Sequence, residues 1–272
     1  MLGAIAGDII GSVHEFKNQK RTDFALFVPE SRFTDDTVLT IAVADCLLTN
    51  SAYTPKFHRY TLKYPNRCYG MRFWHWAISS SQDPYNSWGN GSAMRVSPVA
   101  LAFETLEEVL AEAKRSAEVT HNHAEGIRGA QATAATAFLA RQGESKAKIR
   151  RTIGEMFGYD LSRSTSDIRA TYTFNESCQG TVPEAITAFL DSTDYEDAVR
   201  LAVSLGGDAD TLACIAGGIA EAFYGSVPDH IAAPALALLD DELRETVLRF
   251  RDSYRGRNVR AVNPSMSSFK QP

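Results

Sequence analysis

Apolar side chains recur at helical spacing along most of the chain. Near the start, Leu2, Ile5, Ile9 and Val13 lie three or four positions apart, which predicts a buried amphipathic helix over residues 2–13. The same spacing predicts further helices over residues 34–47, 106–118, 127–139, 183–190, 195–205, 209–224 and 234–251. The strict alternation that marks a strand is nearly absent. The sequence therefore predicts an all-α fold, a compact helical bundle in a single domain over residues 1–272, with a frayed tail at 263–272.

Two segments have a weaker pattern. Residues 53–81 are rich in aromatic and basic side chains, which predicts a helix and a loop with a packed aromatic face. Residues 142–182 are polar and less regular, and there we expect Tyr159, Tyr172 and Phe174 to be the buried anchors.

Glycines break the helical pattern in a regular way. Gly3, Gly7 and Gly11 are four residues apart on the edge of the first predicted helix, and Gly217 and Gly218 lie inside the predicted helix 209–224. Glycine costs helix stability, so a row of this kind indicates a close backbone neighbour. We expect tight helix crossings at both places.

Composition describes an ordinary globular protein. The 272 residues are 44% hydrophobic and 22% charged, with a net charge of −5. A negative chain is a poor partner for a nucleic-acid backbone or an anionic membrane surface. The apolar start lacks a basic residue ahead of it and contains Asp8, which favours a core helix over a signal peptide. Because no apolar run is long enough to span a bilayer, we expect a cytoplasmic protein.

The four cysteines are Cys46, Cys68, Cys178 and Cys214. They form no C-x-x-C pair and have no compact spacing, so they do not resemble a zinc or disulfide framework. We expect buried thiols in a reducing compartment.

Two acidic clusters carry the candidate chemistry. Residues 33–37 read F-T-D-D-T and residues 206–211 read G-G-D-A-D-T, each just ahead of an apolar helical run. Carboxylate and hydroxyl oxygens suit Mg²⁺, Mn²⁺ or Ca²⁺ rather than zinc. Ordinary helix capping explains one such cluster equally well. Two clusters of matched composition are compatible with a shared metal site as well as with two caps.

Other residues have a structural and a functional interpretation. We interpret Asp8 as a buried carboxylate that caps a neighbouring helix, whereas Glu15 stands at a helix end that disfavours an anion and is harder to explain structurally. Residues 89–95, G-N-G-S-A-M-R, suit either an ordinary turn or a phosphate-binding loop. His121 and His123 are two apart and would face different ways on a helix, so a hydrogen bond to a sugar or to backbone is favoured over metal binding.

Together these motifs resemble the ADP-ribosylglycohydrolase family. The resemblance is carried by five segments in the family's order, namely 3–8 with 11–15, 33–37, 89–95, 120–121 and 206–211. It implies an all-helical fold around a binuclear site for two Mg²⁺ (or Mn²⁺) ions. It also implies cleavage of an N- or O-glycosidic bond at the distal ribose of ADP-ribose carried by a modified protein or small molecule.

The resemblance also implies roles for individual residues. The metal ligands would be Thr34, Asp35, Asp36, Asp208, Asp210 and Thr211. The catalytic candidates would be Glu15, Asp35 and Asp36. The substrate-binding residues would be Gly89, Asn90, Gly91, Ser92, Met94, Arg95 and His121, with an aromatic side chain from residues 60–76 or 159–174 over the adenine.

Several alternatives remain open at this point. We expect an arginine-linked adduct first, with serine-linked or nucleobase-linked ADP-ribose and small ADP-ribose derivatives as alternatives. A non-catalytic ADP-ribose reader and a helical dinuclear phosphatase are the rival functions. We expect a monomer with no membrane partner, and nucleic acid only as a modified substrate.

Overall fold

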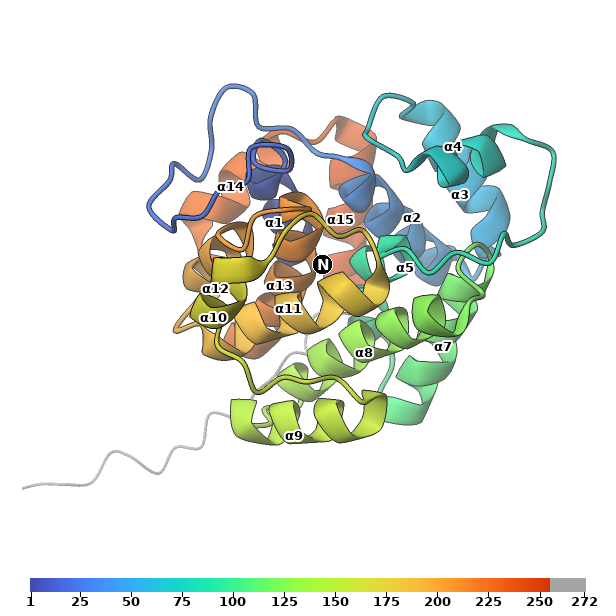
Figure 1. Cartoon of the computed structure of the whole chain (residues 1–272). Coiled ribbons are helices and arrows are strands. Elements are labelled where there is room, and N and C mark those ends of the chain that lie inside the picture. Colours follow the sequence, from blue (N-terminus) through green and yellow to red (C-terminus); the bar gives the residue numbers. More distant parts are fainter. Residues whose placement is uncertain (255–272) are drawn as a thin grey trace, which may run out of the picture.

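The computed structural model describes residues 1–254, and throughout this part of the chain the regular structure is helical (Figure 1). The helices are α1 (Leu2–Gly11), α2 (Asp35–Thr49), α3 (Tyr53–Lys63), α4 (Met71–Ile78), α5 (Gly91–Met94), α6 (Val99–Ala102), α7 (Leu106–Glu118), α8 (Ala124–Arg141), α9 (Lys146–Phe157), α10 (Thr165–Thr171), α11 (Cys178–Asp191), α12 (Tyr195–Val203), α13 (Ala209–Tyr224), α14 (Asp229–Ala237) and α15 (Asp241–Ser253). Within residues 1–254 the one β-type pairing is an isolated bridge between Gly89 and Ser177. The predicted all-α class is confirmed, and the expected tail at 263–272 lies outside the described residues.

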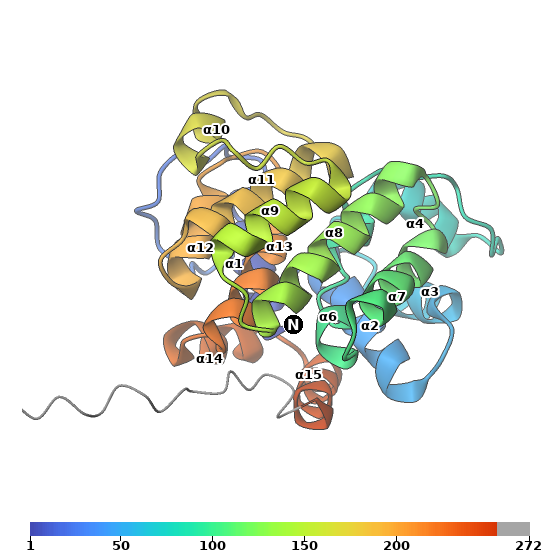
Figure 2. The ribbon, with the colours of Figure 1, turned by 90° about the horizontal axis from the view of Figure 1, so that it is seen from below.

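The core is organised around the crossing of α1 and α13, two segments from opposite ends of the sequence (Figures 1 and 2). A Cβ atom on Gly7 would lie 2.1 Å from the carbonyl oxygen of Ala213, and one on Gly3 would lie 2.4 Å from that of Gly217. Neither position has room for a side chain. The glycine row therefore marks a close helix crossing, as the sequence predicts.

Asp8 joins α1 to the start of α2. Its carboxylate accepts hydrogen bonds from the backbone N–H and the hydroxyl of Thr34, and from the backbone N–H and the hydroxyl of Thr37. The residue is completely buried. Two of these four bonds satisfy N–H groups at the start of α2, where a helix leaves such groups unpaired, and the other two come from hydroxyl groups. The predicted capping role of Asp8 is confirmed.

The predicted helix 234–251 is wrong in one respect, because the structure divides it into α14 and α15. Asp240 caps the second helix by accepting from the backbone N–H of Leu243, so a new helix begins at Asp241. Residues 142–182 are also more regular than predicted, since they contain α9, α10 and the start of α11. Ser145 and Ser164 cap the first two of these helices. Polar capping residues explain why this stretch has a weak hydrophobic period.

Burial differs from the prediction at four residues. Phe174 is 48% exposed and stacks against exposed Phe16, and Tyr159 and Tyr172 are only half-buried. Cys46, Cys178 and Cys214 are buried, but Cys68 is exposed. The aromatic face of residues 53–81 is confirmed, with Tyr60, Tyr64, Phe73 and Trp76 all packed into the core. Among residues 1–254, no helix combines the length and apolarity that crossing a bilayer requires.

Candidate functional site

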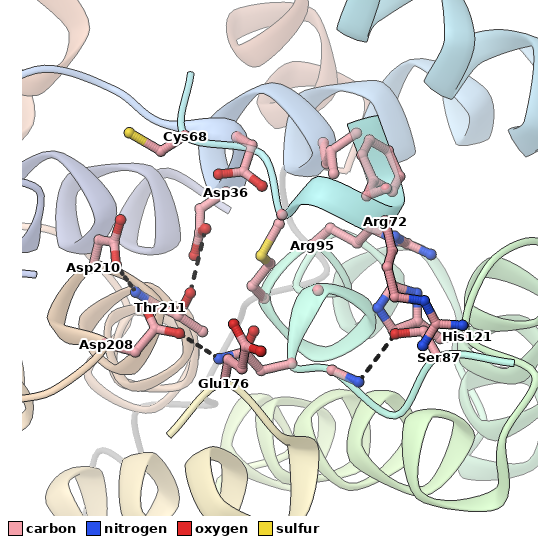
Figure 3. A pocket seen from close by; sticks show the side chains of 18 of the residues that line it. Asp36, Cys68, Arg72, Ser87, Arg95, His121, Glu176, Asp208, Asp210 and Thr211 are labelled. Carbon is pink, nitrogen blue, oxygen red and sulfur yellow. Dashed lines mark hydrogen bonds between the residues drawn. The ribbon is translucent and has the colours of Figure 1, made fainter. Parts of the chain in front are cut away.

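The two acidic clusters meet in one cavity of about 560 Å³. The starts of α2 and α13 contribute to it, together with the segment after α1 and the loop before α5 (Figure 3). The predicted residues that line it are Glu15, Asp35, Asp36, Gly89, Asn90, Gly91, Met94, Arg95, His121, Asp208, Asp210 and Thr211. Side chains from five separate stretches of sequence are therefore brought together.

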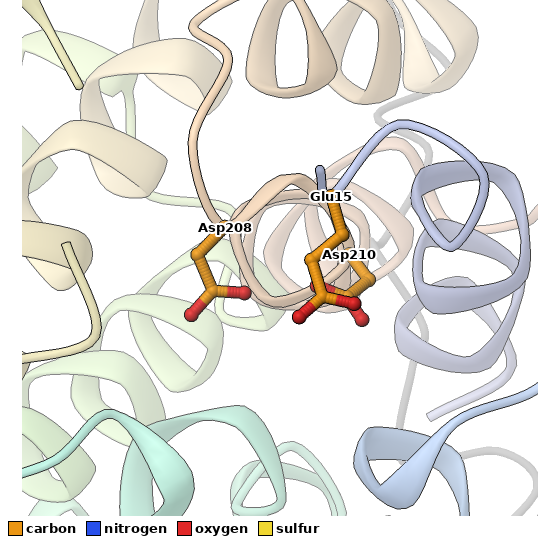
Figure 4. Close-up of side chains that lie close together, drawn as sticks. All are labelled: Glu15, Asp208 and Asp210. Atoms are coloured by element: carbon orange, nitrogen blue, oxygen red, sulfur yellow. The ribbon is translucent and has the colours of Figure 1, made fainter. Parts of the chain in front are cut away.

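Carboxyl groups crowd one end of the cavity. One ligand atom each from Glu15, Asp208 and Asp210 lies within 4.8 Å of the others (Figure 4). Asp36 connects the clusters, because its Oδ2 accepts from the hydroxyl of Thr211 at 3.4 Å. The separation of at most 4.8 Å between ligand atoms is short enough for Glu15, Asp208 and Asp210 to share a cation.

The crowding perturbs the acids. Burial raises the pKa of Glu15 to about 7, assisted by the charges of Asp208 and Asp8 and opposed by Arg32. Burial, followed by repulsion from neighbouring carboxylates, raises the pKa values of Asp35, Asp36 and Asp210 well above their usual range. Like charges held together in a buried place favour protons or a bound cation.

On the lining of this cavity, two buried oxygens have no hydrogen-bond partner within the described residues, namely Oδ1 of Asp36 and Oε2 of Glu15. A buried carboxylate oxygen without a donor is costly. Hard carboxylate oxygens are the ligands that divalent cations of the magnesium type prefer. The donor set therefore fits a divalent metal ion.

The backbone conformation just before α13 orients the second acidic cluster, which contains Asp208 and Asp210. Gly206 and Gly207 have φ angles of 76° and 72°, a left-handed conformation that glycine adopts without strain. This turn ends α12 and places Asp208 at the N-cap of α13. Lys20 secures the turn from outside, since its ammonium group donates to the carbonyl oxygen of Leu205.

Thr34 lies behind the cavity lining. Its hydroxyl donates to Oδ1 of Asp8 at 2.6 Å and accepts from the backbone N–H of Asp36 at 3.3 Å. A hydroxyl oxygen has two lone pairs, so one lone pair is left for a further partner. The capping interpretation of Thr34 is confirmed, and its metal ligation stays a prediction.

The glycine loop, residues 89–95, does not present a row of unpaired backbone N–H groups to the cavity. The N–H of Gly89 donates to the hydroxyl of Ser87, and that of Asn90 donates to the carbonyl oxygen of Glu176. These two N–H groups are therefore already paired within the chain, so a phosphate-binding role of residues 89–95 cannot rest on them. Ser92 is also turned away from the cavity, because its hydroxyl donates to the carbonyl oxygen of Gly126.

Arg95 and His121 form a buried polar pair beside the loop. The Arg95 guanidinium donates to the hydroxyl of Thr120 at 2.9 Å, and this hydroxyl lies 2.7 Å from Nδ1 of His121. Burial and the positive charges of Arg95 and Arg72 lower the pKa of His121 well below its usual value, so the ring is neutral. His123 instead caps α8 by accepting from the N–H of Glu125, which confirms its predicted bond to backbone.

Several cavity residues were not predicted from sequence. Arg72, Tyr85, Ser87, Trp88 and Glu176 all line the cavity. Trp88 is 47% exposed beside the glycine loop, and this large aromatic directly before Gly89 was the available signal. Glu176 carried no recognisable pattern.

Comparison with known proteins places these residues in a family. The sequence model of the ADP-ribosylglycohydrolase family matches residues 1–259. The chain belongs to the ADP-ribosylglycohydrolase family. It is thus a hydrolase of ADP-ribose glycosidic linkages.

Similar ADP-ribosylglycohydrolases extend over most of the chain. ADP-ribosylhydrolase ARH3 of Mus musculus is 26% identical, with 83% of this chain and 82% of the relative covered, and its Homo sapiens counterpart is 27% identical, with 83% and 84% covered. ADP-ribosylarginine hydrolase Tri1 of Pseudomonas putida (strain GB-1) is 27% identical, with 83% of this chain and 69% of the relative covered. A solved structure titled ADP-ribosylglycohydrolase-related protein complex superposes with a TM-score of 0.66 at 25% identity, over 93% of this chain and 97% of that one.

Proposed function

We propose that this ADP-ribosylglycohydrolase is metal-dependent and cleaves the bond between the distal ribose of ADP-ribose and an arginine guanidinium. The convergence of Glu15, Asp35, Asp36, Asp208 and Asp210 in one cavity is the observation that carries the metal dependence. The arginine linkage is supported by the similarity to a relative named ADP-ribosylarginine hydrolase.

The proposed site holds two Mg²⁺ (or Mn²⁺) ions. The first cluster, Thr34, Asp35 and Asp36, and the second, Asp208, Asp210 and Thr211, supply the ligands. When bound, such ions orient the ribose hydroxyls and lower the pKa of a water molecule. The unpaired Oδ1 of Asp36 supports this assignment, because a buried anionic oxygen requires a positive partner.

We assign the proton transfer to Glu15, with Asp35 and Asp36 as the other catalytic candidates. A glycosidic bond breaks through an oxocarbenium-like state, so carboxylates beside the anomeric carbon stabilise the developing positive charge. Glu15 is half-buried on the cavity lining, where a substrate can reach it, whereas Asp36 is only 2% exposed and is bonded to Thr211. A general base must lie within hydrogen-bond reach of the proton that it takes.

The remainder of the cavity would hold the ADP moiety. Arg95 can only donate, so the hydroxyl of Thr120 accepts from it and turns its own proton to Nδ1 of His121. This arrangement puts the ring proton on Nε2, which lies toward Gly91 and can donate to a phosphate or ribose oxygen. Arg72 supplies a positive charge for the diphosphate. The stacking surface for adenine is an exposed aromatic ring of the lining, either Phe174 from the predicted segment 159–174 or Trp88.

Glu176 supports the arginine linkage. Its side chain is exposed on the cavity lining, where its carboxylate can pair with a guanidinium. We therefore expect Glu176→Gln to weaken turnover of ADP-ribosyl-arginine by about tenfold and to leave ADP-ribosyl-serine unaffected. Equal losses on both substrates would remove Glu176 from acceptor recognition.

One assay tests the proposal. The protein is incubated with Mg²⁺ and ADP-ribosyl-arginine, ADP-ribosyl-serine or a phosphomonoester, and the products are identified by mass. We expect free ADP-ribose from the arginine adduct, lost on addition of EDTA and restored by excess Mg²⁺. Activity that persists in EDTA contradicts the metal dependence, and exclusive cleavage of the serine adduct contradicts the linkage. Binding without product indicates a reader, and phosphate release indicates a phosphatase.

A further inference from the structure

A second cavity lies away from the acidic site and shares no lining residue with it. Its volume is about 430 Å³. The first turns of α8 form one wall, the connection between α9 and α10 forms another, and α11 forms the third. Nothing in the proposed reaction uses this cavity.

Three buried oxygens on its lining have no hydrogen-bond partner within the described residues. They are Oε2 of Glu125, the hydroxyl of Tyr159 and Oε2 of Glu184. Glu184 is only 7% exposed, so water reaches it poorly. Leaving a buried carboxylate oxygen without a donor costs free energy, and such an atom indicates a missing partner.

The other oxygen of each glutamate is already paired. Oε1 of Glu125 lies 2.9 Å from a guanidinium nitrogen of Arg128, and Oε1 of Glu184 accepts from Arg163. These ion pairs hold the two carboxylates in fixed orientations, with the second oxygen of each still to be satisfied. The cavity therefore presents a preorganised pair of acceptors.

Pro183 removes a hydrogen-bond donor from α11 beside the cavity. It lies inside α11 and has no N–H, so the carbonyl oxygen of Gln179 cannot receive the usual helical hydrogen bond from position 183. Gln179 and Pro183 both line the cavity. The missing partner must thus bring several hydrogen-bond donors.

The charges of the side chains on the lining limit which ligand the second cavity can bind. The ionisable side chains on the lining, apart from the tyrosine, are three carboxyl groups and two guanidinium groups. With all five ionised, one negative charge is left over, which a monovalent cation neutralises and a divalent ion would exceed. A guanidinium carries a single charge and five N–H donors in a rigid planar fork that matches carboxylate oxygens.

We propose that this second cavity binds a guanidinium group, with Glu125 and Glu184 as its acceptors. The group belongs either to a free small guanidine or to an arginine side chain of a polypeptide. The site is independent of the hydrolase reaction and of the metal cluster.

The test is calorimetric titration of the full-length protein at pH 7.5. Methylguanidine represents the free guanidine, the peptide acetyl-Gly-Arg-Gly-amide represents the polypeptide, and tetramethylammonium is a cation without N–H donors; each carries a single positive charge. We expect saturable binding of methylguanidine, the peptide or both at one site per chain, and none of tetramethylammonium. Which of the two ligands binds identifies the source of the guanidinium.

Matched variants locate the binding. Glu125→Gln and Glu184→Gln should each weaken it by about tenfold or more, since each removes a charge-assisted hydrogen bond. Glu196→Gln is the control, because Glu196 pairs with Arg200 on α12 in the same way but lines neither cavity. Asp208→Asn, in the acidic site, should leave the affinity unchanged. Circular dichroism checks that each variant is folded.

Several results would overturn the proposal. These are failure of both guanidinium ligands to bind the wild-type protein, equal affinity for tetramethylammonium, and unchanged binding in a folded Glu184→Gln variant. Loss of binding in Asp208→Asn would move the ligand to the acidic site. Independently of any variant, the affinity should fall as the pH is lowered and Glu184, whose pKa is raised by burial, becomes protonated. An affinity that stays constant down to pH 4 would also contradict it.

Discussion

Asn90 donates a hydrogen bond of 2.7 Å from its side-chain amide to Oδ2 of Asp208. The same amide donates to the hydroxyl of Thr181 at 3.1 Å on α11. One side chain from the glycine loop thus holds the second acidic cluster against a neighbouring helix. The loop before α5 orients the acids in addition to lining the substrate cavity.

Asn90→Ala should weaken metal binding without removing a predicted ligand. Loss of a group that orients a ligand typically costs about 10–100-fold in metal affinity. Asp208→Asn, which removes the carboxylate itself, should lose at least about 100-fold in affinity and in turnover. Titration with Mn²⁺ measures the metal affinity of both variants, and a turnover assay measures the activity. Asn122→Ala in an exposed loop is the control. Wild-type affinity in both variants would separate Asp208 from the metal site.

Asp8→Asn should destabilise the fold rather than abolish metal binding. The asparagine keeps one acceptor oxygen but turns an amide donor toward the N–H and hydroxyl donors of Thr34 and Thr37. We expect a loss of about 2–4 kcal/mol in the free energy of unfolding, measured by urea denaturation. Thr40→Val, also on α2, removes only the 3.4 Å bond from the Thr40 hydroxyl to the carbonyl oxygen of Met94 and should cost much less stability. A stable Asp8→Asn variant that no longer binds metal would instead make Asp8 a ligand.

Gly7→Ala should disrupt the crossing of α1 and α13. Its Cβ would lie 2.1 Å from the carbonyl oxygen of Ala213, a backbone atom that cannot turn aside. The expected loss is about 3 kcal/mol or more in the free energy of unfolding. In Gly154→Ala the nearest atom is 3.4 Å from the new Cβ, so this helical glycine should gain up to about 1 kcal/mol. Similar melting temperatures for the two variants would contradict the tight crossing.

The metal-free protein should lose stability as the pH rises toward 7. The pKa of Glu15 is about 7 in the folded chain, above its ordinary value of 4.5, so the folded state binds the proton more tightly than the unfolded state does. This contribution is fully present below pH 4.5 and is lost as the pH rises through 7. Mg²⁺ should reverse the trend, because metal binding requires deprotonated ligands and favours higher pH.

Melting temperatures between pH 5 and pH 8, with EDTA or with Mg²⁺, measure this dependence. Glu15→Gln should flatten the EDTA curve in this range. An EDTA curve with the same slope in wild type and variant would show that Glu15 does not titrate there.

The sequence by itself determined the helical class, the close crossing at the glycine row and the residue types of the acidic clusters. Each follows from local chemistry. The periodicity of the apolar residues and the spacing of the glycines indicate which face of a helix is buried. Capping residues before an apolar run indicate where the helix begins. The capping role of Asp8 was also within reach, because a lone acid inside an apolar helix needs nearby donors.

Only the tertiary structure decided which of these groups meet. Glu15 and Asp210 are far apart in sequence, and their contact depends on how α1 crosses α13. Other features of the site also depend on contacts between distant segments. They include the bond that turns Ser92 away from the cavity, the bond between the N–H of Asn90 and the carbonyl oxygen of Glu176, and the position of Glu176 on the cavity lining. The second cavity depends on three elements packing together, and none of them carries a signal for it alone. Side-chain spacing along a chain fixes local conformation, whereas a site is made by distances between segments, which packing alone sets.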